Sequence, residues 1–248
     1  MSTFVLVHGA WHGSWCWKRV RSSLQAKGHN VFTPTLTGVA ERSHLLTRDV
    51  TLETHILDIV NLIRWEELSD IVLCGHSYGG CVISGVADRV PDCIRSLVYL
   101  DAFVLEDGEN LLQQLPEDQQ KQLQEGTTTL GEGWKVPPIP AEVFNVNAND
   151  NDWVNRQCTV QPIETFQQCI KLGGGIKNIK NVSYILATGF LEGSPFPPFY
   201  EKAKAKGWKT TTIGCGHDVM LDRPEELTGL LLDSAAMSQI ARSGSRDA

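Results

Sequence analysis

The chain has 248 residues, of which 42% are hydrophobic and 21% are charged, and its formal net charge is −7. This length suits one large domain or a domain with an insertion, and the composition is ordinary for a globular protein. The negative charge disfavours nucleic acids and anionic membranes as partners, because their phosphates would be repelled. We expect neither a signal peptide nor a membrane helix, which needs ~20 apolar residues in a row.

The cysteines are odd in number and scattered along the chain. No CxxC pair and no metal-ligand spacing with histidine is present, so we expect reduced thiols, no disulfides and no metal. Reduced thiols predict a cytoplasmic protein, which we expect to be a monomer or a homodimer. The seven cysteines are Cys16, Cys74, Cys81, Cys93, Cys158, Cys169 and Cys215.

Strand-like and helix-like segments alternate through the first hundred residues. Short apolar runs predict strands at 3–8, 30–35, 69–75 and 94–101. Apolar residues at helical spacing, or small residues bounded by glycine and proline, predict helices at 15–28, 51–65 and 79–90. Such alternation favours a parallel sheet covered by helices.

Residues 103–180 break this pattern. The segment is rich in Gln, Asn and Pro, and it is too long for a simple connection. We interpret it as an inserted lid, partly helical at 163–172. Alternation then resumes, with strands at 182–188 and 208–215, helices at 197–207 and 224–241, and a frayed tail. The prediction is a doubly wound α/β core of six strands, formed by 1–102 and 181–248, with a lid at 103–180.

The segment Gly75-His76-Ser77-Tyr78-Gly79 follows a predicted strand and opens a predicted helix. A Gly-x-Ser-x-Gly segment in this context is typical of a nucleophile elbow, in which a strained turn exposes the serine oxygen. Glycines on either side leave room for the turn. A merely tight or phosphate-binding turn is the alternative, but the context favours Ser77 as a nucleophile.

A serine nucleophile needs a base and an oxyanion site. His217 lies between the last predicted strand and the last helix, at the sheet edge where open α/β sheets hold their sites. His8 and His12, both in the first loop, are the competitors. That loop, "HGAWHG" at 8–13, carries two glycines, and its amides together with that of Tyr78 could face a developing oxyanion.

Five segments together resemble the small α/β-hydrolase esterases, a group that includes plant methylesterases, plant hydroxynitrile lyases and bacterial carboxylesterases. They are "FVLVHGAWHGSWCW", "LTGVAERSH", "GHSYGG", "LVYLDAFVLEDGE" and "GHDVMLDRPEEL". The resemblance spans nearly the whole chain and is weakest in the lid. It implies an α/β-hydrolase fold without a cofactor, with Ser77 as nucleophile, His217 as base, and the amides of Ala10 and Tyr78 as the oxyanion hole.

The third member of the triad is open. The family usually supplies an Asp after the penultimate strand, but that stretch reads "LATGFLEGSPFPPF" and offers only Glu192. Some relatives place the acid at the end of the preceding strand, which is Asp101 here. Either carboxylate could fix the tautomer of the histidine ring. We favour Asp101 and keep Glu192 as the alternative.

Three activities fit this resemblance. The cyanohydrin-cleaving branch carries a Thr after the first His and a Lys after the catalytic His, whereas this chain has Gly9 and Asp218. We therefore predict a carboxylesterase, with a hydroxynitrile lyase-like enzyme or a non-catalytic small-molecule binder as alternatives. Because no Arg or Lys is obviously placed to hold a charged acid, we expect small, uncharged methyl or aromatic esters. Some bacterial relatives with a similar first loop cleave methyl carbamates, which adds these as candidate substrates.

The pocket is expected between Ser77 and the lid. The side chains that could line it are Trp11, Trp15, Cys16, Tyr78, Phe103, Trp134, Trp153 and Phe166. Of these, Trp11, Cys16, Phe103 and Trp153 are our chosen substrate contacts. Cys16 and Cys215 lie in predicted active-site loops, although buried small residues are the simpler interpretation of both.

Overall fold

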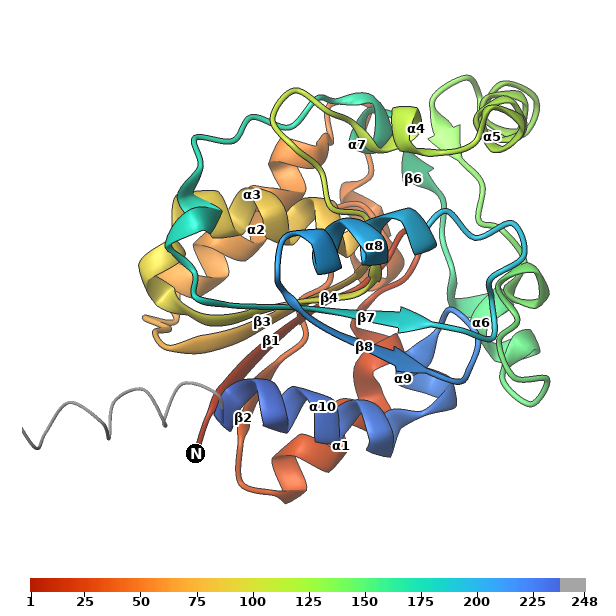
Figure 1. Ribbon diagram of the computed structural model, residues 1–248. Helices are drawn as coiled ribbons and strands as arrows, with labels where there is room; N and C mark the ends of the chain where they lie inside the picture. Colours follow the sequence, from red (N-terminus) through yellow and green to blue (C-terminus); the bar gives the residue numbers. More distant parts are fainter. Residues whose placement is uncertain (237–248) are drawn as a thin grey trace, which may run out of the picture.

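A parallel sheet of six strands runs through the molecule (Figure 1). The computed structural model describes residues 1–236. The strands of this sheet follow the order β2-β1-β3-β4-β7-β8, and each neighbouring pair is parallel. Their bounds are β1 Thr3–Val7, β2 Asn30–Phe32, β3 Ile71–Ser77, β4 Ile94–Ala102, β7 Asn181–Ala187 and β8 Lys209–Ile213. The predicted six-stranded α/β architecture is confirmed.

Helices cover both faces of the sheet (Figure 1). One face carries α1 (Lys18–Ala26), α9 (Val219–Asp222) and α10 (Pro224–Ala236); the other carries α2 (Leu52–Trp65), α3 (Gly79–Arg89) and α8 (Pro197–Ala205). Alternate side chains of each strand feed the two cores, since successive strand residues point to opposite faces. Thus Phe4 and Leu6 pack with α1 and α10, whereas Val5 and Val7 pack with α2 and α3.

Short 3-10 turns join these elements, and one of them changes a predicted helix. The turns are η1 Ser14–Trp17, η2 Ala40–Leu45 and η3 Pro91–Cys93. The helix predicted at 15–28 is therefore a 3-10 turn followed by α1. The helix predicted at 224–241 is described to Ala236, and the rest of it, like the tail, lies outside the described residues. None of the helices in residues 1–236 has the length and apolar character to cross a bilayer.

The segment 103–180 contains short helices and a small antiparallel ribbon. Its elements are α4 Leu111–Gln114, α5 Glu117–Thr129, β5 Lys135–Val136, η4 Ala141–Phe144, α6 Asn151–Gln157, β6 Gln161–Pro162, α7 Glu164–Gln167 and η5 Gly175–Asn178. In Figure 1, α4, α5 and α7 lie together at the top of the view. We refer to 103–180 as the lid, a division of the chain that stays a prediction.

The helix predicted at 163–172 is wrong beyond its first turn. The helix α7 ends at Gln167, and Gln168 takes an extended conformation. The Gln168 side chain instead accepts a hydrogen bond from the Glu53 amide at 2.6 Å, in the first turn of α2. This bond satisfies an amide that a helix N-terminus otherwise leaves without a partner. The predicted helix thus ends at Gln167, where this tertiary contact takes the place of a further turn.

Candidate active site

Ser77 ends strand β3, and helix α3 begins two residues later. Its backbone has a φ of 55°, a conformation that non-glycine residues rarely adopt outside strained sites. A Cβ added to Gly75 would lie 2.5 Å from the Gly79 carbonyl oxygen, and one added to Gly79 would lie 2.7 Å from the His8 carbonyl oxygen. The turn thus requires both glycines, and its geometry is that of a nucleophile elbow.

Asp101 occupies a bulge near the end of β4. His76 pairs with Leu100, and Ser77 pairs with Ala102, so Asp101 has no partner across the ladder. Its φ is 42°. Such bulges bend a strand and re-aim one side chain. The Tyr184 hydroxyl holds the kink, since it accepts from the Ala102 amide at 3.0 Å and donates to the Ala102 carbonyl at 2.7 Å.

The bulge brings the Asp101 carboxylate to His217. The His217 Nδ1 lies 2.6 Å from Asp101 Oδ2, and the Ala187 amide donates to Asp101 Oδ1 at 3.1 Å. Burial raises the pKa of Asp101, while the hydrogen bond from His217 opposes that shift. Glu192 lies elsewhere, exposed, in the wall of the pocket described below. The structure therefore brings Asp101, and not Glu192, into contact with His217.

The His217 ring is enclosed by other rings. Phe196 stacks on it with a centroid distance of 4.8 Å, and His76 lies 4.4 Å away. The His217 amide donates to the Phe144 carbonyl at 2.9 Å, and its carbonyl accepts from His76 Nε2 at 3.0 Å. An Nδ1–H that donates to Asp101 leaves Nε2 as the free nitrogen of a neutral ring. Sequence reasoning missed these ring contacts, because no local pattern marks them.

The amide of Ala10 belongs to a peptide that His8 holds. The Leu36 amide donates to His8 Nε2 at 3.1 Å, so His8 donates through Nδ1 to the Gly9 carbonyl at 2.8 Å. The carbonyl and amide of one peptide point in opposite directions, so this bond also orients the Ala10 N–H. Burial lowers the pKa of His8 to about 3, which keeps the ring neutral. Within residues 1–236, neither the Ala10 nor the Tyr78 amide donates a hydrogen bond to the protein.

Trp11 is held by three lid residues. Its amide donates to Gln161 Oε1 at 3.0 Å, its carbonyl accepts from the Thr159 amide at 3.0 Å, and its indole donates to the Val136 carbonyl at 3.2 Å. These bonds maintain a backbone with a φ of 64°. Gln161 is a buried polar residue that our sequence reasoning missed. Its partner is 150 residues away, so only the fold reveals the contact.

A pocket of about 490 Å³ lies between the elbow and the lid. Ser77, His217, Ala10 and Tyr78 all contribute to its wall. Ser77 Oγ makes no hydrogen bond to any described residue. The hydrogen bonds of a catalytic serine often form only when substrate is bound. The remaining wall is mainly apolar and includes the expected Trp11, Phe103 and Phe166, with Glu192 as its single carboxylate and neither Lys nor Arg from residues 1–236.

Cys16 and Trp153 do not line this pocket, so their expected substrate contact is corrected. Cys16 is fully buried with α1 side chains beneath the sheet, and Trp153 packs edge-on against Trp15 at 5.0 Å. Trp134 lies in a different surface groove, next to Arg48. Burial raises the pKa of Cys16, and burial raises that of Cys215 to about 12. Neither thiol is a ready nucleophile, because the thiolate is the reactive form.

Metal ligands were not expected, and residues 1–236 contain no group of three or more His, Cys, Asp or Glu side chains suited to a metal ion. The seven cysteines are all free. What the site does assemble is a serine on a strained turn, a histidine paired with a buried carboxylate, and two amides without protein acceptors. These are the parts of a nucleophilic acyl-transfer site.

The chain is similar to known proteins in sequence and in fold. The chain is 48% identical, over 92% of its length and 97% of the relative's, to a carbendazim hydrolyzing esterase of Nocardioides sp. (strain SG-4G). It is 36% identical to methylesterase 2 of Arabidopsis thaliana, over 41% of this chain and 39% of the relative. An extracellular alpha/beta-hydrolase from a Paenibacillus species has the same fold, with a TM-score of 0.82, 24% identity, and coverage of 94% of this chain and 99% of that one. The predicted fold and the predicted class of ester-bond hydrolase are confirmed. Residues 4–230 match the alpha/beta hydrolase family, and the chain belongs to that family.

Proposed function

We propose that the chain is a serine carboxylesterase for small, uncharged methyl or aryl esters, with Ser77 as nucleophile, His217 as general base and Asp101 as the acid. The observation that carries this proposal is the 2.6 Å contact between His217 and Asp101, in the same pocket as a serine on a strained turn. The apolar wall, with one carboxylate and no described cation, supports an uncharged substrate.

Acylation is the first step. His217 Nε2 takes the proton of Ser77 Oγ, and the oxygen attacks the ester carbonyl carbon. The carbonyl π electrons move to the oxygen, where the amides of Ala10 and Tyr78 stabilise the negative charge. The Asp101 carboxylate stabilises the His217 imidazolium. Collapse of the adduct expels the alkoxide, which takes the proton from His217 Nε2 and leaves as an alcohol.

Deacylation repeats these moves with water. His217 takes a proton from a water molecule, the hydroxide attacks the acyl carbon, and Ser77 leaves with the proton returned by His217. No cofactor takes part in either step. Ser77, His217 and Asp101 thus act in both steps. The acid product then leaves a pocket whose wall includes Glu192. A carboxylate product is repelled by that side chain, which favours its release.

Methyl carbamates are a second substrate class, favoured by the relative that is named for carbendazim hydrolysis. Carbendazim is a methyl carbamate of an aromatic heterocycle. Attack by Ser77 would expel methanol and leave a carbamoyl-enzyme, and water would release a carbamic acid that loses CO₂ to give the amine. A carbamate carbonyl is less electrophilic than an ester carbonyl. This activity would therefore depend more strongly on the Ala10 and Tyr78 amides.

The test compares wild type with Ser77→Ala on p-nitrophenyl acetate. We expect the variant to lose at least ~10³-fold in kcat, with an unchanged circular dichroism spectrum. An aryl fluorophosphonate should phosphonylate Ser77 Oγ with loss of HF, so the Ser77 peptide of wild type gains the mass of the reagent less HF, and no peptide of the variant gains it. Equal rates in the two proteins would reject Ser77 as the nucleophile, and rates no higher than spontaneous hydrolysis would leave the non-catalytic binder. Release of cyanide from a cyanohydrin, without ester hydrolysis, would favour the lyase alternative.

A panel of substrates separates the classes. It contains a methyl ester of an aromatic acid, an aryl acetate, carbendazim, and a methyl ester that bears a second carboxylate. We expect the neutral members to be cleaved and the anionic one to be the poorest. The free cysteines support the expected cytoplasmic location, which stays a prediction like the monomeric or dimeric state.

A further inference from the structure

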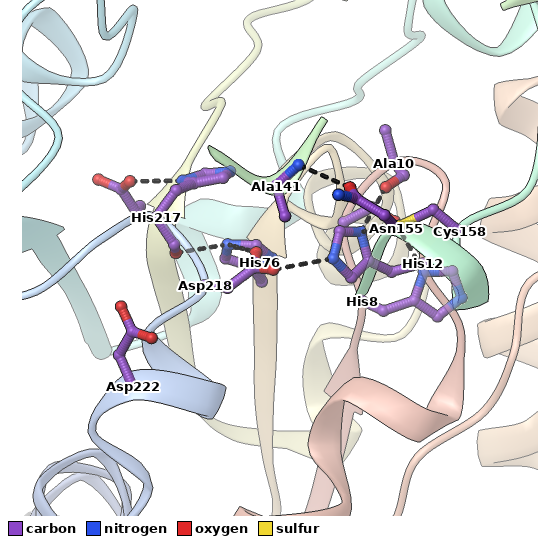
Figure 2. A network of polar contacts seen from close by, with 12 residues as sticks. His8, Ala10, His12, His76, Ala141, Asn155, Cys158, His217, Asp218 and Asp222 are labelled. Atoms are coloured by element: carbon purple, nitrogen blue, oxygen red, sulfur yellow. Dashed lines mark hydrogen bonds and ion pairs between the residues drawn. The ribbon is translucent and has the colours of Figure 1, made fainter. Parts of the chain in front are cut away.

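A buried ion pair joins His12 of the first loop to Asp218, and neither residue has been given a role so far (Figure 2). The His12 Nε2 is 3.0 Å from Asp218 Oδ2, and the side chains are 5% and 0% exposed. The other ring nitrogen, Nδ1, is 2.7 Å from the Ala10 carbonyl oxygen. His12 also stacks on Trp15 with a centroid distance of 4.9 Å. Neither His12 nor Asp218 lines the pocket.

The partners of His12 define its protonation. A carbonyl oxygen and a carboxylate oxygen are both acceptors, so both ring nitrogens of His12 must donate. The ring is therefore an imidazolium. Burial alone would lower the pKa of His12, but the charge of Asp218 raises it well above its ordinary value. The flat face of Trp15 is a further favourable neighbour for a buried cation.

The pair joins two loops that the site depends on. His12 and Ala10 belong to the loop after β1, and Asp218 directly follows His217. The carboxylate lies between two rings, because its Oδ1 is 4.0 Å from His76 Nε2, which in turn donates to the His217 carbonyl (Figure 2). His76 thus holds the backbone of His217, the proposed base. His12 holds the backbone of Ala10, whose amide is proposed to bind the oxyanion.

The two peptides that flank Ala10 are consequently held from different sides. His8 holds the Gly9 carbonyl before it, and His12 holds the Ala10 carbonyl after it. The Ala10 N–H belongs to the first of these peptides. Because this peptide and the next one are both fixed, the N–H keeps its direction while charge develops on the substrate, which is what an oxyanion hole requires. A buried ion pair is weak evidence for a role in stability, since apolar replacements are often as stable. Its two hydrogen-bonded ends nevertheless specify one arrangement of the two loops.

We propose that His12 and Asp218 are positioning residues, whose buried ion pair fixes the Ala10 amide relative to His217 and so stabilises the oxyanion without contacting substrate. This inference rests on the proposed esterase function. The pair acts through the Ala10 peptide on one side and through the residue after His217 on the other. Loss of the charge on Asp218 should therefore weaken binding of the transition state more than binding of the substrate.

The test is Asp218→Asn, which keeps the size of the side chain and removes its charge. On p-nitrophenyl acetate we expect kcat to fall about 10- to 100-fold while KM changes less than about threefold. Removal of one oxyanion-hole donor lowers kcat by up to ~10²–10³, and a displaced donor should cost less than that. Asp150→Asn is the matched control, because Asp150 pairs with Arg19 at 2.6 Å away from the pocket. The control should keep the wild-type kcat.

A pair of ketones separates positioning from general disruption. Ser77 adds to trifluoroacetophenone and turns its carbonyl oxygen into an oxyanion, whereas acetophenone only occupies the pocket. Asp218→Asn should weaken inhibition by trifluoroacetophenone by the factor lost in kcat, and it should leave the affinity for acetophenone within about twofold of wild type. An equal loss of affinity for both ketones would overturn the proposal, as would an unchanged kcat.

A second variant covers the case in which Asp218→Asn does not fold. The double variant His12→Gln with Asp218→Asn removes both charges together and avoids a lone buried ion. We expect it to fold and to keep a kcat at least tenfold below wild type; recovery of the full kcat would overturn the proposal. Hydrolysis at the wild-type rate in Ser77→Ala would reject the proposed serine mechanism itself. If hydrolysis depends on Ser77 but kcat is unchanged in Asp218→Asn and in the double variant, only the positioning role is rejected.

Discussion

Asp101 reaches His217 because the backbone of β4 kinks at Asp101 itself. The extra residue in the ladder, the φ of 42° and the two hydrogen bonds between the Tyr184 hydroxyl and Ala102 together direct the Asp101 carboxylate toward His217. The sequence could single out Ser77 and His217 as candidates, and the structure places both in the wall of one pocket. The sequence could not separate Asp101 from Glu192, since a bulge is a property of strand pairing and has no local pattern.

Asp101→Asn should lower kcat on p-nitrophenyl acetate by about 10³- to 10⁴-fold. The amide cannot stabilise the imidazolium of His217, and it can bind the wrong tautomer. Glu192→Gln, measured beside it, should cost less than tenfold, because no hydrogen bond joins Glu192 to His217 in the described part of the chain. Steady-state kinetics check both variants. The opposite ranking would assign the acid to Glu192.

Glu192 should instead act on specificity. Glu192 is the single carboxylate that residues 1–236 contribute to the pocket wall, and it repels substrates that carry a negative charge. Glu192→Gln should lower KM for a methyl ester with a second carboxylate by about two- to fivefold, the range of an exposed charge interaction. Glu201→Gln, an exposed acid on α8 that pairs with Lys204, is the control and should change nothing. The effect should shrink at high salt.

At the scale of elements, α3 owes its position to small residues. A Cβ added to Gly80 would lie 2.2 Å from the Phe103 carbonyl oxygen, so the helix can approach the start of the lid only with glycine there. The same approach places Tyr78, just before α3, in the pocket wall. Residue spacing predicted α2 and α3 well. It failed in the lid, where contacts such as that of Gln168 with α2 end a helix early.

Gly80→Ala should destabilise the protein by about 1–3 kcal/mol, the usual cost of overpacking. Gly229→Ala is the matched control, because Gly229 lies in α10 and an added Cβ would meet nothing within 4 Å. That change should stabilise the helix by about 0.5–1 kcal/mol. Urea unfolding measures both free energies. Similar values for the two variants would contradict the close approach of α3 to the lid.

At the scale of the whole molecule, buried histidines make the fold sensitive to acid. His8, His55 and His76 are 0% exposed, and burial lowers the pKa of each, to about 3 for His8 and about 4 for His55. A histidine that is neutral when folded takes up a proton on unfolding once the pH falls below its ordinary value near 6.5. His12 has the opposite shift and offsets part of this effect at low pH.

Stability should therefore fall between pH 7 and pH 5. The unfolded state binds more protons than the folded state in this window, and His8 and His55 should each contribute a loss of about 2 kcal/mol. Urea unfolding at both pH values measures the loss. His55→Gln should reduce it by about 2 kcal/mol, whereas His44→Asn, at an exposed site, should leave it as it is. Equal pH dependence in wild type and His55→Gln would refute this account.

The sequence was informative about the core because strands and helices alternate there with clear apolar patterns. It was less informative about which side chains face the pocket and which face the core. Cys16 and Trp153 were expected to contact substrate, yet the Cys16 side chain lies in the core beneath the sheet and Trp153, partly buried, packs against that core. Contacts across long separations, such as those of His12 with Asp218 and of Trp11 with Gln161, likewise depend on the assembled fold.

Those contacts of Trp11 have a practical consequence for engineering. Val136, Thr159 and Gln161 hold the residue next to Ala10, so the inserted segment is a structural part of the loop that it covers. A chimera that receives the segment of a relative to change its substrate range would also exchange these three anchors. Transplants that retain these anchors should keep turnover, and those that replace them should have to rebuild the loop after β1 as well.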